Sequence, residues 1–367
     1  MNVKDYLDGH EVIELKNGQS GADVYMVDNE YILKHVVKEK IDGDAFETYK
    51  REALFYQAKN GKDQYVPEIE KLELSDNEII LIMKKYSELN RADIDDELIS
   101  KVANLLACVH GSNIPGFLKN KSVTNEKTDD QNIEPKAIEE NDVQNIVPVA
   151  IEETDDQNIV PAVIEETDDY NIVPVAIEET DDQDSAPEAI ESSIDENTDK
   201  QKLLSSKEID DCVEGWKSVL AEHPGVFAEE ILDDVAANIN DIISLKNKEK
   251  SVLIHGDFHW ENILKDDDGN LILCDWQGVK VGGPSEDLSF FLSRLGADGV
   301  NIDEDKFLNA YADAYRNISG ENLEISDIKK YMWASRIITT FQYWHFFLHG
   351  SDADRVKEVY EKMSIKM

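Results

Sequence analysis

Residues 251–278, SVLIHGDFHWENILKDDDGNLILCDWQG, contain three side chains that can offer oxygen ligands. Asp257 and Asn262 are five positions apart, and Asp275 follows thirteen positions after Asn262. Carboxylate and carboxamide oxygens suit Mg²⁺, which usually takes its remaining ligands from water and phosphate groups. A further carboxylate beside such a cation can orient an attacking hydroxyl group. The residue types therefore indicate metal-assisted chemistry on a phosphate-bearing substrate.

Short strands and one tight turn must position these groups. The pattern predicts strands at 252–254, 263–264 and 271–274, and a turn at 266–270. A hairpin of the last two strands would bring Asn262 and Asp275 side by side at one end of the ladder, with Asp257 next to them. The acids of the turn are interpreted as turn formers rather than ligands; they are Asp266, Asp267 and Asp268.

The N-terminal region predicts a small antiparallel sheet. Residues 11–37 form short runs rich in Val, Ile and Tyr, separated by G-Q-S-G and D-N-E. Lys34 lies within an apolar strand, so it needs a partner, and residues 44–59 have helical spacing with Glu47 and Glu52 as possible counterions. The alternatives are a surface lysine with exposed glutamates, or a lysine that binds nucleotide phosphates and is oriented by a helix glutamate.

The turn before the second strand offers a weaker signal for phosphate binding. Without side chains, Gly18 and Gly21 would let backbone N–H groups approach phosphate oxygens, with Ser20 between them. A G-x-x-G turn before a strand is more often a plain hairpin turn. The turn alone therefore leaves both interpretations open.

The layout of these motifs resembles kinase chemistry. H-G-D-F-H-W-E-N and D-W-Q are similar to the H-R-D-x-x-x-x-N and D-F-G elements, and more closely to their H-G-D and D-W forms in the aminoglycoside phosphotransferase and choline kinase-like family. The segment G-G-P-S-E-D-L at 282–288 resembles that family's G-x-P-x-x-D-L. The resemblance covers residues 10–117 and 203–350.

The resemblance implies a role for each matched residue. Lys34 would bind the phosphates of ATP or GTP, K-R-E-A-L would make Glu52 its partner, and G-Q-S-G-A-D-V-Y would be the nucleotide loop with Ser20 and Gly21. The remaining implied roles are an acceptor-orienting Asp257, Mg²⁺ ligands Asn262 and Asp275, and catalytic-loop support from His255 and Asp287.

Departures from eukaryotic protein kinases disfavour a protein substrate. Gly256 replaces the Arg of H-R-D, Trp276-Gln277 replaces Phe-Gly, and no A-P-E follows. The D-W-Q form is similar to ecdysteroid-kinase-like and hydroxylysine-kinase-like relatives as well as to antibiotic kinases. The acceptor therefore stays open between an aminoglycoside, an amino alcohol and similar small molecules.

An acidic 13-residue repeat lies between the two regions of this resemblance. Five copies span 132–196, from NIEPKAIEENDVQ to DSAPEAIESSIDE, and together they carry 21 acids and one Lys. One proline per copy prevents a long helix, and each apolar patch is too small to offset the entropy of ordering. We interpret the repeats as a mostly disordered linker without a role or, alternatively, as an arm that binds an unknown partner.

Composition limits the partners and the location. The chain has 367 residues, 79 Asp plus Glu, 37 Lys plus Arg and a net charge of −42, which disfavours nucleic-acid binding. Three scattered cysteines indicate a reducing compartment. No apolar run is long enough for a membrane span or a signal peptide, so we expect a cytoplasmic protein without membrane partners. The acidity weakly favours a cationic acceptor.

These observations predict an α+β, two-lobe protein-kinase-like fold. The expected divisions are a nucleotide-binding N-lobe at 1–83, a hinge and the start of the C-lobe at 84–117, the insert at 118–200 and the rest of the C-lobe at 201–367. The expected activity is Mg²⁺-dependent transfer of the terminal phosphoryl group of a nucleotide to a small-molecule hydroxyl. The alternatives are a non-catalytic scaffold or coat-type protein whose acidic repeats bind a basic partner, and an atypical protein kinase.

Aromatic residues gather in 331–349, YMWASRIITTFQYWHFFLH. They could line a site for a cationic substrate through cation–π contacts, or pack in the core of a large helical lobe. Core packing is the favoured interpretation.

Overall fold

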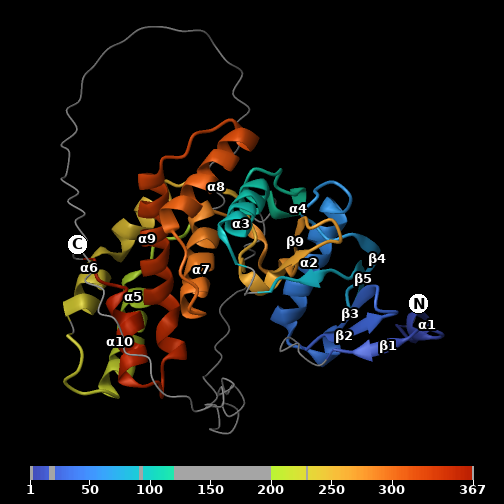
Figure 1. The fold of residues 1–367 in the computed structure, drawn as a ribbon. Coiled ribbons are helices and arrows are strands. Elements are labelled where there is room, and N and C mark those ends of the chain that lie inside the picture. Colours follow the sequence, from blue (N-terminus) through green and yellow to red (C-terminus); the bar gives the residue numbers. More distant parts are fainter. Residues whose placement is uncertain (1–2, 16–20, 91–93, 120–199, 229, 366–367) are drawn as a thin grey trace, which may run out of the picture. The chain divides into compact units, whose positions relative to one another are not determined.

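The computed structural model describes residues 3–15, 21–90, 94–119, 200–228 and 230–365. The acidic repeats at 132–196 lie outside these described residues. The described chain has a sheet-containing N-lobe and a largely helical C-lobe (Figure 1).

The N-lobe is a five-stranded antiparallel sheet in the order β1-β2-β3-β5-β4. Its strands are β1 (Val12–Glu14), β2 (Asp23–Val27), β3 (Tyr31–Val37), β4 (Ile69–Leu74) and β5 (Glu78–Lys84), preceded by the short helix α1 (Val3–Leu7). Asp28 and Asn29 have positive φ angles in the tight turn between β2 and β3, a conformation that Asn and Asp tolerate better than most residues. The turn places Val24 of β2 opposite Lys34 of β3.

One long helix packs on the N-lobe sheet and reaches the C-lobe. After the 3-10 turn η1 (Lys38–Lys40), α2 runs over Gly43–Lys59 and begins where the carboxylate of Asp42 accepts a hydrogen bond from the Asp44 N–H. Phe46, Tyr49 and Ala53 of α2 form an apolar cluster with Val36 and Ile79 of the sheet. The C-terminal half of α2 packs instead on the segment that contains Asp275.

Short strands at the start of the C-lobe hold the motif region. They are β6 (Ser87–Glu88), β7 (Val252–Ile254), β8 (Ile263–Lys265), β9 (Leu271–Leu273) and β10 (Lys280–Gly282), with 3-10 turns η3 (Trp260–Asn262) and η4 (Trp276–Gly278). β8 and β9 form the predicted hairpin, with Ile263 opposite Leu273. β7 pairs with β10 in a separate ladder.

Helices make up the rest of the C-lobe. They are α3 (Asp96–His110), α4 (Gly116–Lys119), α5 (Ser206–Ala221), α6 (Glu230–Lys246), α7 (Pro284–Ala297), α8 (Glu304–Ser319), α9 (Ile325–Tyr343), the 3-10 turn η5 (Trp344–Phe347) and α10 (Ala353–Glu361). One apolar core joins α3, α7 and α8 to the motif strands, and a second joins α5, α6, α9 and α10. The first core fixes the motif region, because Leu253, Phe258 and Ile263 are all buried in it.

The aromatic residues of α9 and η5 divide between core and surface. Phe341 is fully buried, and Trp333 and Trp344 pack against the second core. Phe346 and Phe347 are 67% and 76% exposed. Core packing therefore accounts for three of these rings, and no aromatic cage follows from their sequence clustering.

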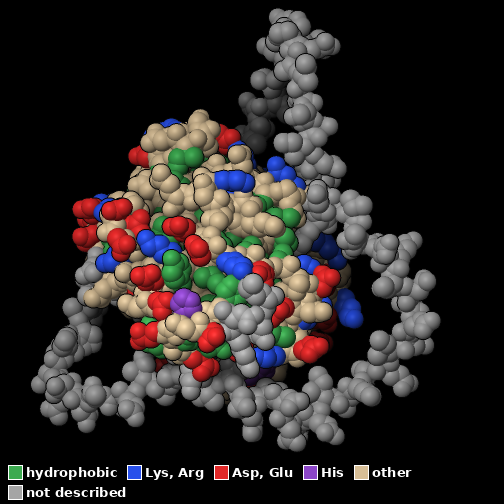
Figure 2. Space-filling view, turned by 90° about the vertical axis from the view of Figure 1, so that its right-hand side faces the viewer, with side chains coloured by type: hydrophobic (Ala, Val, Ile, Leu, Met, Phe, Trp, Pro, Cys, Tyr) green, Lys and Arg blue, Asp and Glu red, His purple; other side chains and the backbone are tan. Residues whose placement is uncertain are grey.

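Charged side chains of both signs are interspersed over the face shown in Figure 2, which is the N-lobe side of the view in Figure 1. No helix within the described ranges combines the length and the apolar composition that a membrane span requires.

Candidate functional site

Lys34 and Glu52 form a buried ion pair between β3 and α2. The Lys34 ammonium nitrogen lies 3.0 Å from Oε2 and 3.2 Å from Oε1 of Glu52. Alternation along β3 buries Leu33 completely on one face and turns Lys34 to the other, toward α2. Of the two glutamates considered as partners, Glu52 is 1% exposed and makes the pair, whereas Glu47 is exposed to solvent.

The ammonium of Lys34 also faces Asp275 of the C-lobe, at 3.5 Å from Oδ1. Burial would lower the pKa of Lys34, but the two carboxylates beside it raise the pKa above its usual value. Burial raises the pKa of Glu52 more than its pairing with Lys34 lowers it. Lys34 is therefore a fixed cation at neutral pH, shared between a structural carboxylate and one that is 39% exposed.

Asp275 is presented by a strained turn after β9. Its φ and ψ angles are both 61°, in the left-handed region that Asp tolerates better than β-branched or bulky residues. The following residue, Trp276, is fully buried and stacks on Phe55 of α2, with ring centroids 3.9 Å apart. Gln277 donates its amide hydrogen to Asp275 Oδ1 at 2.7 Å. The buried indole thus anchors the turn, and Asp275 faces the N-lobe lysine.

The loop between β7 and η3 carries Asp257 and Asn262. The Asn262 amide group donates to the backbone carbonyl of Asp257 at 2.9 Å and lies 3.4 Å from its carboxylate. The same group lies 3.0 Å from His259 Nε2, and His259 Nδ1 lies 2.7 Å from Glu261. These contacts close the five-residue loop, and the carboxylate of Asp257 remains 45% exposed.

Asp257 and His259 shift each other's pKa in opposite directions. Burial would raise the pKa of Asp257, but His259 hydrogen-bonds to its carboxylate and holds the pKa below its usual value. Burial would lower the pKa of His259, but Asp257 and Glu261 raise it. Asp257 is therefore ionised at neutral pH, and its carboxylate can accept a proton.

A buried carboxylate supports the start of this loop. Asp287 at the beginning of α7 is 1% exposed and accepts hydrogen bonds from the backbone N–H groups of His255 at 2.7 Å and Gly256 at 2.9 Å. Burial would raise the pKa of Asp287, but its hydrogen bond with His110 and these backbone bonds lower it. His110 Nδ1 lies 2.8 Å from the hydroxyl of Tyr311, so this support continues into α8.

The His255 ring ties the loop to the Asp275 turn. Its Nε2–H donates to the Cys274 carbonyl at 2.9 Å, and its Nδ1 accepts from the Asp257 N–H at 3.3 Å. Both contacts are satisfied by one neutral tautomer, and burial lowers the pKa of His255. Burial and the nearby Asp275 raise the pKa of the Cys274 thiol to about 12, so this thiol is not a nucleophile at neutral pH.

The donor set fits a Mg²⁺ ion that also binds phosphate groups. Asn262 and Asp275 stand at neighbouring ladder positions, because the Cys274 N–H donates to the Asn262 carbonyl at 3.0 Å. Gln277 and Lys34 both contact Oδ1 of Asp275, and within the described chain no hydrogen bond engages its Oδ2 or the side-chain oxygen of Asn262. No cluster of three or more His, Cys, Asp or Glu side chains in the described ranges could hold a metal alone. Two protein oxygens with phosphate and water ligands are typical of Mg²⁺.

Two further sequence expectations concern the nucleotide loop. Gly21 has a φ angle of +76°, and an added Cβ would lie 2.7 Å from a methyl group of Ile41. Both facts favour glycine at this position. Ser20 lies outside the described residues.

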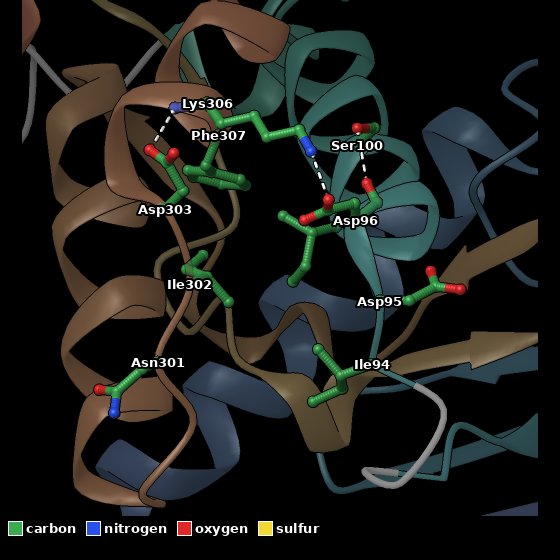
Figure 3. Close-up of a pocket in the computed structure, with 10 residues that line it drawn as sticks. Ile94, Asp95, Asp96, Ser100, Asn301, Ile302, Asp303, Lys306 and Phe307 are labelled. Atoms are coloured by element: carbon green, nitrogen blue, oxygen red, sulfur yellow. Dashed lines mark hydrogen bonds and ion pairs between the residues drawn. The ribbon is translucent and has the colours of Figure 1, made fainter.

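A small pocket of about 130 Å³ at the N-termini of α3 and α8 has acidic walls but no relation to this site (Figure 3). Asp95 accepts from the Leu98 N–H and Asp303 from the Lys306 N–H, so both are helix caps. Asp96 pairs with the Lys306 ammonium. The carboxylates of this pocket are therefore engaged in holding the two helices.

Three contributors to the site were not anticipated from the sequence. His110 supports Asp287, Gln277 contacts Asp275, and Arg51 of α2 donates to the Gln277 carbonyl at 3.4 Å. The position of His110 carried a signal, because it lies four residues after Leu106 on the apolar stripe of α3, where a polar side chain needs a buried partner. Arg51 had no such signal, because its contact depends on how the lobes meet.

Comparison with known proteins gives the class of fold. The chain is similar over residues 160–319 to the model of the ecdysteroid kinase-like family. A search of curated proteins finds no match.

Solved structures match nearly the whole chain. Aminoglycoside phosphotransferase APH(2'')-Ib bound to ADP has 13% identity and a TM-score of 0.50, with 98% of this chain and 94% of that chain covered. A mutant of aminoglycoside 2'-phosphotransferase-IIIa bound to GDP has 11% identity and a TM-score of 0.50, with 98% and 93% covered. An ethanolamine kinase of Plasmodium vivax has 14% identity and a TM-score of 0.48, with 98% and 84% covered. The two likenesses at 0.50 confirm the predicted two-lobe kinase-like fold and its resemblance to aminoglycoside phosphotransferases.

Proposed function

We propose that this protein transfers the terminal phosphoryl group of ATP or GTP to a hydroxyl group of a small molecule, with Mg²⁺ as cofactor. The observation that carries the proposal is the position of Lys34, within 3.0 Å of Glu52 and 3.5 Å of Asp275. An N-lobe cation thereby meets a C-lobe carboxylate beside a loop with a second accessible carboxylate. This arrangement suits a phosphate chain that spans the two lobes.

Each residue has one role in this proposal. Lys34 binds nucleotide phosphate oxygens, and Glu52 holds the ammonium in place. Asn262 and Asp275 would hold Mg²⁺, which when bound neutralises charge on the phosphates. Ser20 and Gly21 belong to the turn proposed to contact the phosphates, and His255 and Asp287 position the catalytic loop.

Asp257 is proposed to orient the acceptor. The acceptor oxygen attacks the terminal phosphorus, the bond from that phosphorus to the bridging oxygen breaks, and the nucleoside diphosphate leaves. The carboxylate of Asp257, which is ionised at neutral pH, accepts the hydroxyl proton. Positioning and charge neutralisation supply most of the rate enhancement, because phosphoryl transfer requires little covalent assistance from the protein.

A coupled nucleotide-consumption assay tests this function with aminoglycosides, choline, ethanolamine, sugars and amino-acid alcohols as acceptors. We expect Mg²⁺-dependent turnover with at least one acceptor and loss of turnover in Asp257→Asn. Absence of both turnover and a nucleotide-induced thermal shift would favour the non-catalytic scaffold. Autophosphorylation that disappears in Asp257→Asn would favour an atypical protein kinase.

A further inference from the structure

A pocket of about 570 Å³ lies between α6, β10 and α9 of the C-lobe, with Arg51 of α2 also in its wall. Nine of the nineteen lining residues come from the end of α6, the whole of β10 and the C-terminal part of α9. Its volume is in the range of small-molecule sites. Of the residues assigned a role above, only Arg51 lines this pocket.

The pocket begins next to the catalytic loop. β10 pairs with β7, so Lys280 in the pocket wall stands opposite Ile254. Val279, just before β10, is part of the pocket wall. The preceding residue, Gly278, packs its carbonyl group against Gly256, where an added Cβ would lie 2.1 Å from the Gly278 carbonyl oxygen. Gly256 directly precedes Asp257, so the wall starts a few residue spacings from that carboxylate, on the order of 10 Å. Asp257 does not line the pocket, so an acceptor held there has to extend its hydroxyl group beyond the wall at Val279 to meet this carboxylate.

The acids of the pocket wall are already engaged. The Lys246 ammonium lies 2.7 Å from Glu249 and 3.3 Å from Glu286, and Lys280 lies 2.8 Å from Glu286. Glu249 also accepts hydrogen bonds from the backbone and hydroxyl of Ser285. Two cations thus balance two carboxylates, and this network contributes no net charge to the pocket.

Two cations of the wall have no carboxylate partner among the described residues. Arg51 makes its described contact with the neutral carbonyl of Gln277, at 3.4 Å. Within the described chain, no carboxylate pairs with Arg51 or with Lys200. In a chain of net charge −42, a pocket wall with two cations that pair with no carboxylate of the described residues favours an anionic occupant.

The rest of the wall is suited to hydroxyl groups. Its neutral polar side chains are carboxamides and hydroxyls. Asn247 and Gln342 hydrogen-bond to Gln201, and the hydroxyls belong to Ser251, Ser335, Thr339 and Tyr343. Tyr343 is the one aromatic residue among the described lining residues, so the wall has no cage for a quaternary amine. Carboxamides and hydroxyls both donate and accept hydrogen bonds, as a polyhydroxylated ligand requires.

We propose that this pocket binds the acceptor, and that the acceptor is a polyhydroxylated molecule whose acidic group pairs with Arg51 and Lys200. This inference rests on the proposed phosphoryl transfer and reverses the cationic acceptor favoured by overall composition. The net acidity of a chain does not decide the charge of a ligand when the acids near its pocket are neutralised locally.

The test compares three probes that share a hexose skeleton and differ in charge: glucuronate, glucose and glucosamine. Calorimetry on the full-length protein with ADP and Mg²⁺ measures binding, and the coupled assay measures turnover. We expect glucuronate to bind at least about tenfold more tightly than glucosamine, with the difference reduced at high salt. Equal or tighter binding of glucosamine, or no measurable binding of glucuronate, would overturn the proposal.

Matched variants locate the interaction. We expect Arg51→Gln and Lys200→Gln each to weaken glucuronate binding about tenfold, Arg51→Lys to restore part of it, and the exposed α5 change Lys217→Gln to have no effect. Glucuronate binding unchanged in Arg51→Gln and Lys200→Gln would contradict the assignment. If the wild-type protein does not bind ADP, the proposed function itself is contradicted. If it binds ADP but prefers glucosamine to glucuronate, only the anionic acceptor is refuted.

Discussion

The ammonium nitrogen of Lys34 lies 3.5 Å from Oδ1 of Asp275, although 241 positions separate the two residues in the chain. The first belongs to a strand of the N-lobe sheet and the second to the turn after a C-lobe hairpin. Each is held on its own side, Lys34 by Glu52 and Asp275 by Gln277. The contact is therefore a measure of whether the two lobes present one site.

Removal of Lys34 and removal of Glu52 should lower the free energy of unfolding by different amounts. Lys34→Met leaves Glu52, at 1% exposure, without its cation, and we expect a loss of about 3 kcal/mol in the free energy of unfolding. Glu52→Gln should lower the free energy of unfolding by less, because Lys34 is more exposed than Glu52 and still has Asp275 as an ion-pair partner. Urea unfolding measures both. The double variant Lys34→Met/Glu52→Leu should recover stability but not activity; a Lys34→Met protein as stable as the wild type would refute the buried pair.

Asp257→Asn should lower turnover about 10³-fold, because the amide cannot accept the acceptor proton. The fold and the affinity for nucleotide should stay close to wild type, since Asp257 is 45% exposed and is not assigned to the metal. Asp268→Asn, in the exposed turn of the same segment, is the matched control and should retain full turnover. Steady-state kinetics with an identified acceptor, together with circular dichroism, decide the outcome. Turnover above one tenth of wild type in Asp257→Asn would exclude the assigned role.

Gly256→Ala tests how tightly the loop is packed on the Asp275 turn. Gly256 has a φ angle of +81°, and an added Cβ would lie 2.1 Å from the Gly278 carbonyl oxygen, which cannot move without the backbone. Gly269 has nearly the same φ angle, +82°, with no atom within 4 Å of the added Cβ. We expect Gly269→Ala to cost about 1 kcal/mol for conformation alone and Gly256→Ala more than about 3 kcal/mol. Equal losses in thermal or urea unfolding would show that the close approach is absent in solution.

Stability should fall on acidification through His255. Its pKa is lowered by burial from the usual value of 6.5, so the unfolded chain binds a proton that the folded protein does not. The contribution is therefore present above pH 6.5 and is lost as the pH falls from 6.5 toward the lower folded value. Between pH 7.5 and 5.5, urea unfolding of the wild type should show a steeper loss than His255→Gln, by up to ~1.4 kcal/mol per pH unit. Parallel profiles would indicate that the pKa of His255 is not lowered in the folded protein.

The fold could be predicted where local pattern and motif spacing agree. Runs rich in Val, Ile and Tyr predicted the N-lobe strands within residues 11–37, and the turn D-D-D-G-N between two short apolar runs predicted the β8–β9 hairpin. Asp266 accepts the backbone N–H groups of Asp268 and Asn270, as a turn former does. The resemblance to a known family supplied the order of the lobes.

Contacts between distant segments could not be predicted from local pattern. The choice of Glu52 over Glu47 follows from which face of α2 is buried, and spacing alone left both open. The turn at Asp275 is followed by Trp276, which stacks on Phe55, more than 200 residues away in sequence. The charge of the proposed acceptor pocket depends on four segments that are separate in the sequence, around residues 51, 200, 246–249 and 280–286. The catalytic and metal-binding roles remain predictions from geometry.

Calorimetric titration of a non-hydrolysable ATP analogue, with and without Mg²⁺, tests the central claim most directly. The wild type should bind the analogue tightly only with Mg²⁺. Asp275→Asn, which keeps a residue suited to the left-handed turn, should lose at least about tenfold in Mg²⁺-dependent affinity, while Asp257→Asn keeps it. An affinity for the analogue that does not depend on Mg²⁺, or that is the same in Asp275→Asn and the wild type, would contradict a phosphate site formed by Lys34, Asn262 and Asp275.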